Sequence, residues 1–201
     1  MTTKNIFTNA QFVGSFPSCE NLPADDGAEI AFCGRSNSGK SSVINALTKN
    51  KKLAKTSKTP GRTQAINIFS LKDYETRRLI DLPGYGYAKV SKAMRNEWAT
   101  TIDEYLNSRT SIRGLIIIMD IRHPFKDSDD LLIDWCETNQ IPVLALLNKS
   151  DKLSKSKVNQ ELSKGQKRMK DLSTPNQVIA FSSKDFYGLD NLSELLEELL
   201  D

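Results

Sequence analysis

The stretch that decides the fold is residues 29–42, EIAFCGRSNSGKSS. It starts as a short apolar run and continues into glycines, hydroxyl side chains and one lysine. Gly34, Gly39, Lys40 and Ser41 are spaced as in the pattern G-x-x-x-x-G-K-[ST]. Small residues let successive backbone N–H groups point toward a phosphate chain, and a helix that begins there adds the positive end of its dipole. The stretch therefore predicts a buried strand, a phosphate-binding loop and a helix, in that order.

Two side chains of this loop have expected chemical roles. Lys40 can reach the β- and γ-phosphates of a nucleotide, and the Ser41 hydroxyl can bind Mg²⁺. The alternative is a glycine-rich turn that only caps a helix, but the strand before the loop and the helix after it favour the nucleotide interpretation. The candidate nucleotide contacts in this loop are Gly34, Arg35, Ser36, Asn37, Ser38, Gly39, Lys40, Ser41 and Ser42.

Along the rest of the chain, short apolar runs alternate with longer amphipathic segments. Strands are expected at Glu29–Cys33, Ala65–Leu71, Thr76–Asp81, Gly114–Asp120, Pro142–Leu147 and Gln177–Phe181. Helices are expected at Gly39–Lys49, Lys92–Asn107, Asp127–Thr138, Ser154–Asp171 and Leu189–Leu200. This alternation predicts an α/β fold with a doubly wound, mostly parallel sheet, and the short stretch KDYET between the second and third strands predicts an antiparallel hairpin. The first 28 residues and Asn50–Thr63 are expected to be loops.

The composition is that of one soluble domain. The chain has 201 residues, of which 38% are hydrophobic and 26% charged, and its net charge of +3 permits contact with nucleic acid without requiring it. Three widely spaced cysteines, Cys19, Cys33 and Cys136, disfavour a disulfide framework or a zinc site. We find no signal-peptide pattern and no apolar run long enough to span a bilayer, so a cytoplasmic location without a membrane partner is expected.

Three further motifs follow expected strands, where ligands of open α/β sheets bind. In DLPG, Asp81 can hold Mg²⁺ through water and the Gly84 N–H can meet a γ-phosphate. In NKSD, the Asp151 carboxylate can accept from guanine N1–H and N2–H₂, a donor pair that adenine lacks. Lys149 can cover the base with its aliphatic part while Asn148 braces the loop. In FSSK, a backbone N–H can donate to guanine O6. The candidate contacts are Asp81, Leu82, Pro83, Gly84, Asn148, Lys149, Ser150, Asp151, Phe181, Ser182, Ser183 and Lys184.

Together with these motifs, four longer stretches resemble the EngB family of bacterial ribosome-assembly GTPases, a group of translation-factor-related P-loop GTPases. The stretches are AFCGRSNSGKSSVINAL, TPGRTQAINIF, DLPGYGYA and DIRHPFKDSD. The resemblance runs from about Ala28 to the C-terminus, which implies an N-terminal extension over 1–27 and a single GTPase domain over 28–201. Many family members carry threonine where this chain has Asn148, but asparagine is the common choice across GTPases.

The resemblance implies a P-loop GTPase fold: three α/β/α layers around a mostly parallel six-stranded sheet with one antiparallel hairpin strand. It also implies GTP and GDP as ligands, Mg²⁺ as cofactor, slow hydrolysis, and a nucleotide-gated switch in late assembly of the large (50S) ribosomal subunit. Alternatives are a regulator of cell division, septation or tRNA modification with little turnover, a binding module in which GTP only stabilises the structure, and a P-loop kinase or ATPase.

The loop before the second strand is the expected switch I, where a threonine hydroxyl completes the Mg²⁺ shell. Thr56, Thr59 and Thr63 are candidates, and the resemblance favours Thr63. It implies nucleotide contacts at Gly61, Arg62, Thr63, Gln64 and Ala65. The catalytic candidates are Lys40 and Thr63, and no general base can be assigned.

Three single residues raise further expectations. Tyr85 stands where Ras-like GTPases place the glutamine that orients the attacking water, which predicts a slow enzyme; Tyr85 and Tyr87 are equally candidates for switch II contacts. Asn37 is similar to asparagines of potassium-stimulated GTPases, so K⁺ is a candidate cofactor. His123 is expected to be structural or interfacial rather than a base.

Positive charge gathers in two places. One group lies in or before switch I, and the other lies on the fourth expected helix: Lys49, Lys51, Lys52, Lys55, Lys58 and Arg62, then Lys164, Lys167, Arg168 and Lys170. With the family resemblance, these groups favour contact of a monomeric protein with ribosomal RNA and ribosomal proteins.

Overall fold

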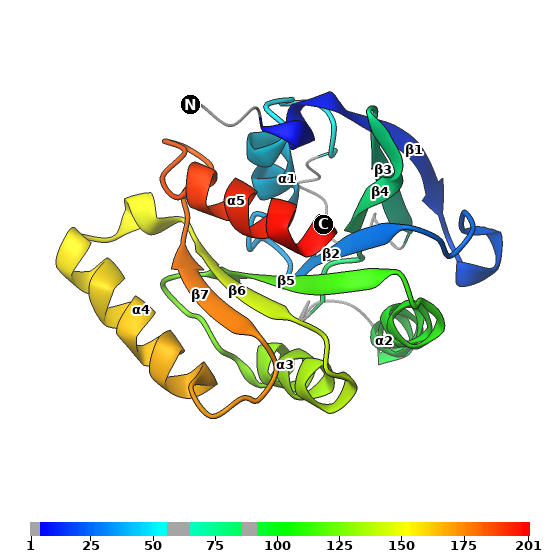
Figure 1. The fold of residues 1–201 in the computed structure, drawn as a ribbon. Coiled ribbons are helices and arrows are strands. Elements are labelled where there is room, and N and C mark those ends of the chain that lie inside the picture. Colours follow the sequence, from blue (N-terminus) through cyan, green and yellow to red (C-terminus); the bar gives the residue numbers. More distant parts are fainter. Residues whose placement is uncertain (1–4, 56–64, 86–91) are drawn as a thin grey trace.

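A computed structural model describes residues 5–55, 65–85 and 92–201 (Figure 1). Its centre is a seven-stranded sheet in the order β1-β3-β4-β2-β5-β6-β7. The strands are β1 (Ala10–Phe16), β2 (Ala28–Gly34), β3 (Ile66–Leu71), β4 (Tyr74–Asp81), β5 (Ile112–Asp120), β6 (Val143–Asn148) and β7 (Asn176–Ala180). The α-helices are α1 (Lys40–Leu47), α2 (Lys92–Ser108), α3 (Asp127–Asn139), α4 (Lys155–Met169) and α5 (Leu189–Leu200). Short 3-10 helices are η1 (Ile6–Asn9), η2 (Cys19–Asn21) and η3 (Ser150–Lys152).

The helices form two layers because alternate residues of the central strands face opposite sides of the sheet. Ile30 and Phe32 of β2 pack into one buried cluster together with side chains of α1 and α5. Ala31 and Cys33 pack into the other, with side chains of α2, α3 and α4. A strand covered on both faces is apolar throughout, which explains the unbroken hydrophobic runs in the sequence. The three-layer α/β/α prediction is confirmed (Figure 1).

The expected hairpin is also confirmed. β3 and β4 pair antiparallel, whereas β2 pairs in parallel with both β4 and β5, and β6 pairs in parallel with β5 and β7. All the parallel strands therefore end at the same edge of the sheet, and the motifs that follow them are brought together there.

The N-terminal segment differs from the prediction. The sheet has seven strands rather than six, because β1 pairs antiparallel with β3 in a part of the chain expected to be a loop. Of its residues only Ala10 is buried, and Phe12 is 55% exposed. The strand is held by backbone pairing more than by burial of its own side chains, so its sequence lacks the alternating pattern that predicts strands.

A buried ionic cluster joins the segment before β2 to the amino-terminal end of the parallel strands. Glu29 is fully buried and accepts from Arg78 Nη1 at 3.2 Å and from Tyr105 Oη at 2.6 Å. Arg109 pairs with the same carboxylate and donates to the Pro23 carbonyl at 2.8 Å. The cluster fixes this segment at the end of the sheet opposite the phosphate loop.

Candidate functional site

The phosphate loop has the predicted place, between β2 and α1. Gly39 precedes the helix with φ of 96°, a left-handed conformation that favours glycine, and Asn37 also has a positive φ of 65°. A Cβ atom on Gly39 would lie 2.4 Å from Asn148 Nδ2. The glycine is therefore needed for the turn and for the close approach of the NKSD loop.

The phosphate loop meets the end of β4 through charged side chains. Lys40 Nζ forms an ion pair with the Asp81 carboxylate, whose other oxygen accepts from Asn67 Nδ2 at 3.3 Å. Ser41 follows Lys40 in the first turn of α1. A hydroxyl and a carboxylate are the hard oxygen donors that suit Mg²⁺, so this donor set fits the cofactor.

The DLPG segment runs beside the phosphate loop. Tyr85 N donates to Gly34 O at 3.1 Å, and Ser36 N donates to Tyr85 O at 2.9 Å. A Cβ atom on Gly84 would lie 3.3 Å from Gly34 O, so the two backbones are close here. This pairing places the Gly84 backbone next to the residues that are expected to surround phosphate.

The Asn148 side chain joins the NKSD motif to two of the other loops. Its Nδ2 donates to Ser38 O of the phosphate loop at 2.9 Å, and its Oδ1 accepts from Ser183 Oγ of FSSK at 3.1 Å. Asn148 is buried, with 1% of its surface exposed. The asparagine therefore ties the phosphate loop to both expected base-binding motifs.

Lys149 makes a second link to the phosphate loop. It has a φ of 68°, and its Nζ donates to Asn37 O at 2.5 Å and to Asp120 Oδ2 at 3.0 Å. Asp120 also accepts from Arg122 Nε at 2.9 Å, and the hydrogen bonds from Arg122 and then Lys149 hold the pKa of Asp120 below its usual value. A carboxylate thus fixes the lysine that is expected to cover the base.

Asp120 is not among the site residues predicted from the sequence, but the structure places it beside these loops. Asp120 is the last residue of β5 and lies opposite Asn148 of β6 in the parallel register. The rule that ligands gather at strand ends could have identified it, because Asp120 also opens the family stretch DIRHPFKDSD.

The Asp151 carboxylate retains capacity to accept hydrogen bonds. Oδ1 accepts from Ser182 Oγ at 3.1 Å, which connects the NKSD and FSSK motifs. Oδ2 is buried and lies 3.2 Å from Lys152 Nζ, but it accepts no hydrogen bond from the described residues. A buried acceptor of this kind is costly unless a ligand satisfies it, and the N–H groups of guanine are suitable donors.

The remaining predicted residues are either outside the described part of the chain or not among these contacts. Gly61, Arg62, Thr63 and Gln64, the alternatives Thr56 and Thr59, and Tyr87 lie outside the described residues. Ala65 is half-buried just before β3. The His123 side chain is exposed, and its backbone carbonyl accepts from Arg35 Nη2 at 2.6 Å.

Comparison with known proteins gives a consistent set of relatives. The family described as "50S ribosome-binding GTPase" matches residues 29–149. The chain is 50% identical over 197 residues to a probable GTP-binding protein EngB of Aeromonas salmonicida (strain A449), covering 98% of this chain and 90% of the relative. It is also 50% identical over 192 residues to the protein of that name from Pseudoalteromonas translucida (strain TAC 125), covering 96% of this chain and 86% of the relative.

Solved structures share the fold. A crystal structure of a probable GTP-binding protein engB has a TM-score of 0.61 at 23% identity, covering 86% of this chain and 98% of that chain. A variant of Aquifex aeolicus Era bound to GDP and AlF₄⁻ has a TM-score of 0.65 at 19% identity, covering 86% of this chain and 56% of that chain.

Proposed function

This chain belongs to the EngB family of GTPases, and on that premise we propose that it is a nucleotide-gated switch in late assembly of the large ribosomal subunit. The protein binds guanine nucleotides and hydrolyses GTP, as its family does. The family whose match covers residues 29–149 is described as ribosome-binding, which supports the large subunit as partner over the alternatives in cell division or tRNA modification.

One observation carries the nucleotide site: two neighbouring side chains of NKSD bond directly to the phosphate loop. Asn148 reaches Ser38 O at 2.9 Å and Lys149 reaches Asn37 O at 2.5 Å. These contacts hold the guanine-selective loop at a fixed position relative to the phosphate loop. A single ligand with a guanine at one end and a phosphate chain at the other fits that arrangement.

The phosphate end is assigned from the charged contacts. Lys40 would bind the β- and γ-phosphates, and Ser41 and Thr63 would hold Mg²⁺ directly while Asp81 holds it through water. Bound Mg²⁺ neutralises charge on the phosphate oxygens. In the GTP state these groups would order the switch segments, and loss of the γ-phosphate would release them.

Slow turnover is expected because Tyr85 lacks the carbonyl and amide with which glutamine orients water. We also propose that K⁺ bound near Asn37 assists GTP hydrolysis. Turnover measured in KCl and in NaCl at equal ionic strength tests this second point, and equal rates would refute it.

The ribosomal role is tested by co-sedimentation of the purified protein with large subunits in GTP analogue, in GDP and without nucleotide. We expect stronger pelleting with the GTP analogue. Equal pelleting in all three conditions would contradict a nucleotide-gated role. No pelleting in any condition would refute the large subunit as the partner.

A cytoplasmic monomer is proposed for the location and oligomeric state. Among the described residues, no helix is both long and apolar enough to cross a membrane. Sedimentation of the purified protein alone measures the oligomeric state, and a dimer would contradict the proposal.

A further inference from the structure

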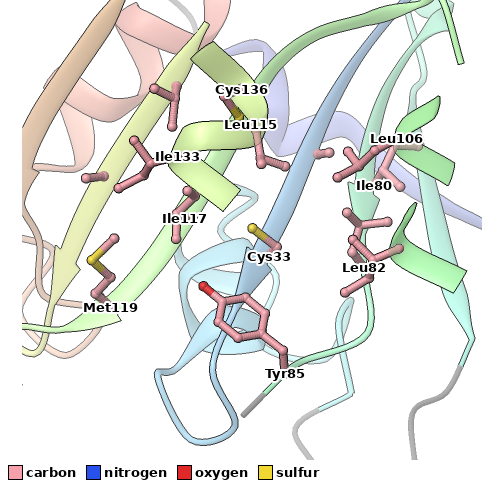
Figure 2. Packing of buried hydrophobic residues seen from close by; sticks show 14 of the residues in the cluster. Cys33, Ile80, Leu82, Tyr85, Leu106, Leu115, Ile117, Met119, Ile133 and Cys136 are labelled. Atoms are coloured by element: carbon pink, nitrogen blue, oxygen red, sulfur yellow. The ribbon is translucent and has the colours of Figure 1, made fainter. Parts of the chain in front are cut away.

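Two stretches that mark the family, DLPGYGYA and DIRHPFKDSD, meet inside the protein. The Tyr85 hydroxyl donates to Asp129 Oδ1 at 2.8 Å. Both side chains are buried, with 4% of Tyr85 and 0% of Asp129 exposed. Figure 2 shows the Tyr85 ring among the buried side chains near Cys33. The phenol therefore faces the interior, and burial raises its pKa, which keeps it protonated as a donor.

The Asp129 carboxylate also connects to two other parts of the molecule. Its Oδ2 accepts from Lys126 N at 2.9 Å, which caps the start of α3. Arg35 of the phosphate loop forms an ion pair with the same oxygen, with Nε at 3.5 Å. One buried carboxylate thus joins the phosphate loop, the residue after DLPG and the first turn of α3.

The backbone of Tyr85 is paired with the phosphate loop on both sides, through Gly34 O and Ser36 N. Its side chain is held by Asp129. Gly84 stands directly before this doubly anchored residue, so the position of the Gly84 N–H depends on both the backbone pairing and the side-chain anchor.

We propose that Asp129 is a positioning residue for recognition of the γ-phosphate, acting through Tyr85. A correctly placed Gly84 N–H stabilises bound GTP by donating to its γ-phosphate, whereas GDP has no γ-phosphate to accept this hydrogen bond. Loss of the bond between Tyr85 and Asp129 therefore weakens GTP binding more than GDP binding. This inference rests on the nucleotide site proposed above, and it gives the two family-marking stretches a joint role.

The test compares dissociation constants for a non-hydrolysable GTP analogue and for GDP at one Mg²⁺ concentration. Tyr85→Phe removes only the hydroxyl. We expect it to raise the ratio of analogue to GDP dissociation constants about 3- to 10-fold, the effect of one hydrogen bond. In Asp129→Asn the side chain has only one acceptor oxygen, whereas the Tyr85 hydroxyl and the Lys126 N–H each need one. The ratio of analogue to GDP dissociation constants should therefore rise in this variant too.

A double variant tests whether the two residues act through the same bond. If they do, Tyr85→Phe adds nothing to the shift of Asp129→Asn, because the bond is already disturbed. Shifts that simply multiply would show that the two side chains act independently and would overturn the proposal.

Tyr105→Phe is the matched control. Tyr105 is also fully buried and donates to a fully buried carboxylate, Glu29, that is paired with arginines, but at the opposite end of the sheet. Tyr105→Phe should lower the melting temperature and leave the ratio of analogue to GDP dissociation constants unchanged. A wild-type ratio in Tyr85→Phe, or an equal shift in Tyr105→Phe, would overturn the positioning role. A wild-type protein that bound neither guanine nucleotide would instead refute the proposed site.

Discussion

At the scale of single residues, guanine preference is expected to depend on the Asp151 carboxylate. Asp151→Ala removes the acceptor for two N–H groups of the base, and hydrogen bonds to charged groups contribute about 1.5–3 kcal/mol each. We expect GDP affinity to fall by at least about 100-fold and the preference over ADP to disappear. Competition by GDP and ADP against a labelled guanine nucleotide measures both. Asp134→Ala, at an exposed position of α3, is the control. An unchanged preference in Asp151→Ala would refute the assignment of the base site.

Asp120 is expected to support nucleotide binding by holding Lys149. In Asp120→Asn the lysine loses its ion pair, and the loop above the base becomes less well fixed. GDP and a GTP analogue should both bind about 3- to 10-fold more weakly, the range of one hydrogen bond, with guanine preference retained. A selective loss of GTP analogue alone would assign Asp120 to the γ-phosphate instead.

The same residue gives a pH dependence of stability. Arg122 and Lys149 lower the pKa of Asp120 in the folded protein, whereas the unfolded chain has a value of about 4. Charged Asp120 therefore stabilises the fold above about pH 4, and this contribution is lost as pH falls toward the lower folded pKa. The difference in unfolding free energy between wild type and Asp120→Asn should be largest near neutral pH and shrink below pH 4. Urea unfolding at several pH values measures it, and a constant difference would contradict this origin.

At the scale of elements, the sequence predicts best what is decided locally. The apolar runs that become β5 and β6 are buried on both faces, so their sequence alone marks them as central strands. The sequence also predicts the phosphate loop, DLPG and NKSD at one edge, because parallel strands end together.

Elements and contacts that depend on distant partners cannot be predicted from local sequence patterns. β1 is held by its pairing with β3, and most of its side chains are outside the core. No local sequence pattern therefore predicts this strand. The bonds from Tyr85 to Asp129 and from Lys149 to Asp120 join segments far apart in the chain. Spacing along the sequence carries no information about which of several carboxylates a side chain will meet.

The N-terminal segment is expected to contribute to stability although it lies before the GTPase domain proposed from the resemblance. Phe7 is completely buried in the cluster with α1 and α5, whereas Phe12 of β1 is 55% exposed. Phe7→Ala should lower the unfolding free energy by about 3–5 kcal/mol, and Phe12→Ala by much less, because only the first leaves a cavity. Urea unfolding of the two variants checks this. Equal effects would mean that the segment before β2 is not packed as described.

At the scale of the whole molecule, the two ends of the parallel strands carry different groups of residues. The carboxyl ends bear the nucleotide loops, and the amino-terminal end bears the buried cluster around Glu29. α4 packs against β7, at the opposite edge of the sheet from β1 (Figure 1).

The basic residues of α4 are not equivalent as candidates for RNA contact. Arg168 pairs with Asp130, and Lys164 pairs with Glu161 at 2.6 Å, so their charge is partly neutralised within the protein. Lys167 is exposed and forms no ion pair within the part of the chain that the structure describes, and the same holds for Lys170, which directly follows the helix. Within the group of Lys164, Lys167, Arg168 and Lys170, these two lysines are therefore the best placed to displace counterions from a phosphate backbone.

Charge reversal at this pair, Lys167→Glu with Lys170→Glu, is expected to weaken binding to large subunits and to reduce its salt dependence. Each lost phosphate contact lowers the slope of log affinity against log salt by about 0.7–0.9, so two contacts lower it by roughly 1.5. Affinity measured between low and moderate salt, in the presence of GTP analogue, gives this slope. The control with the same change in net charge is Lys72→Glu with Arg113→Glu, at exposed positions away from α4. If both double variants change the slope equally, attraction depends on net charge alone, and α4 is not the contact surface.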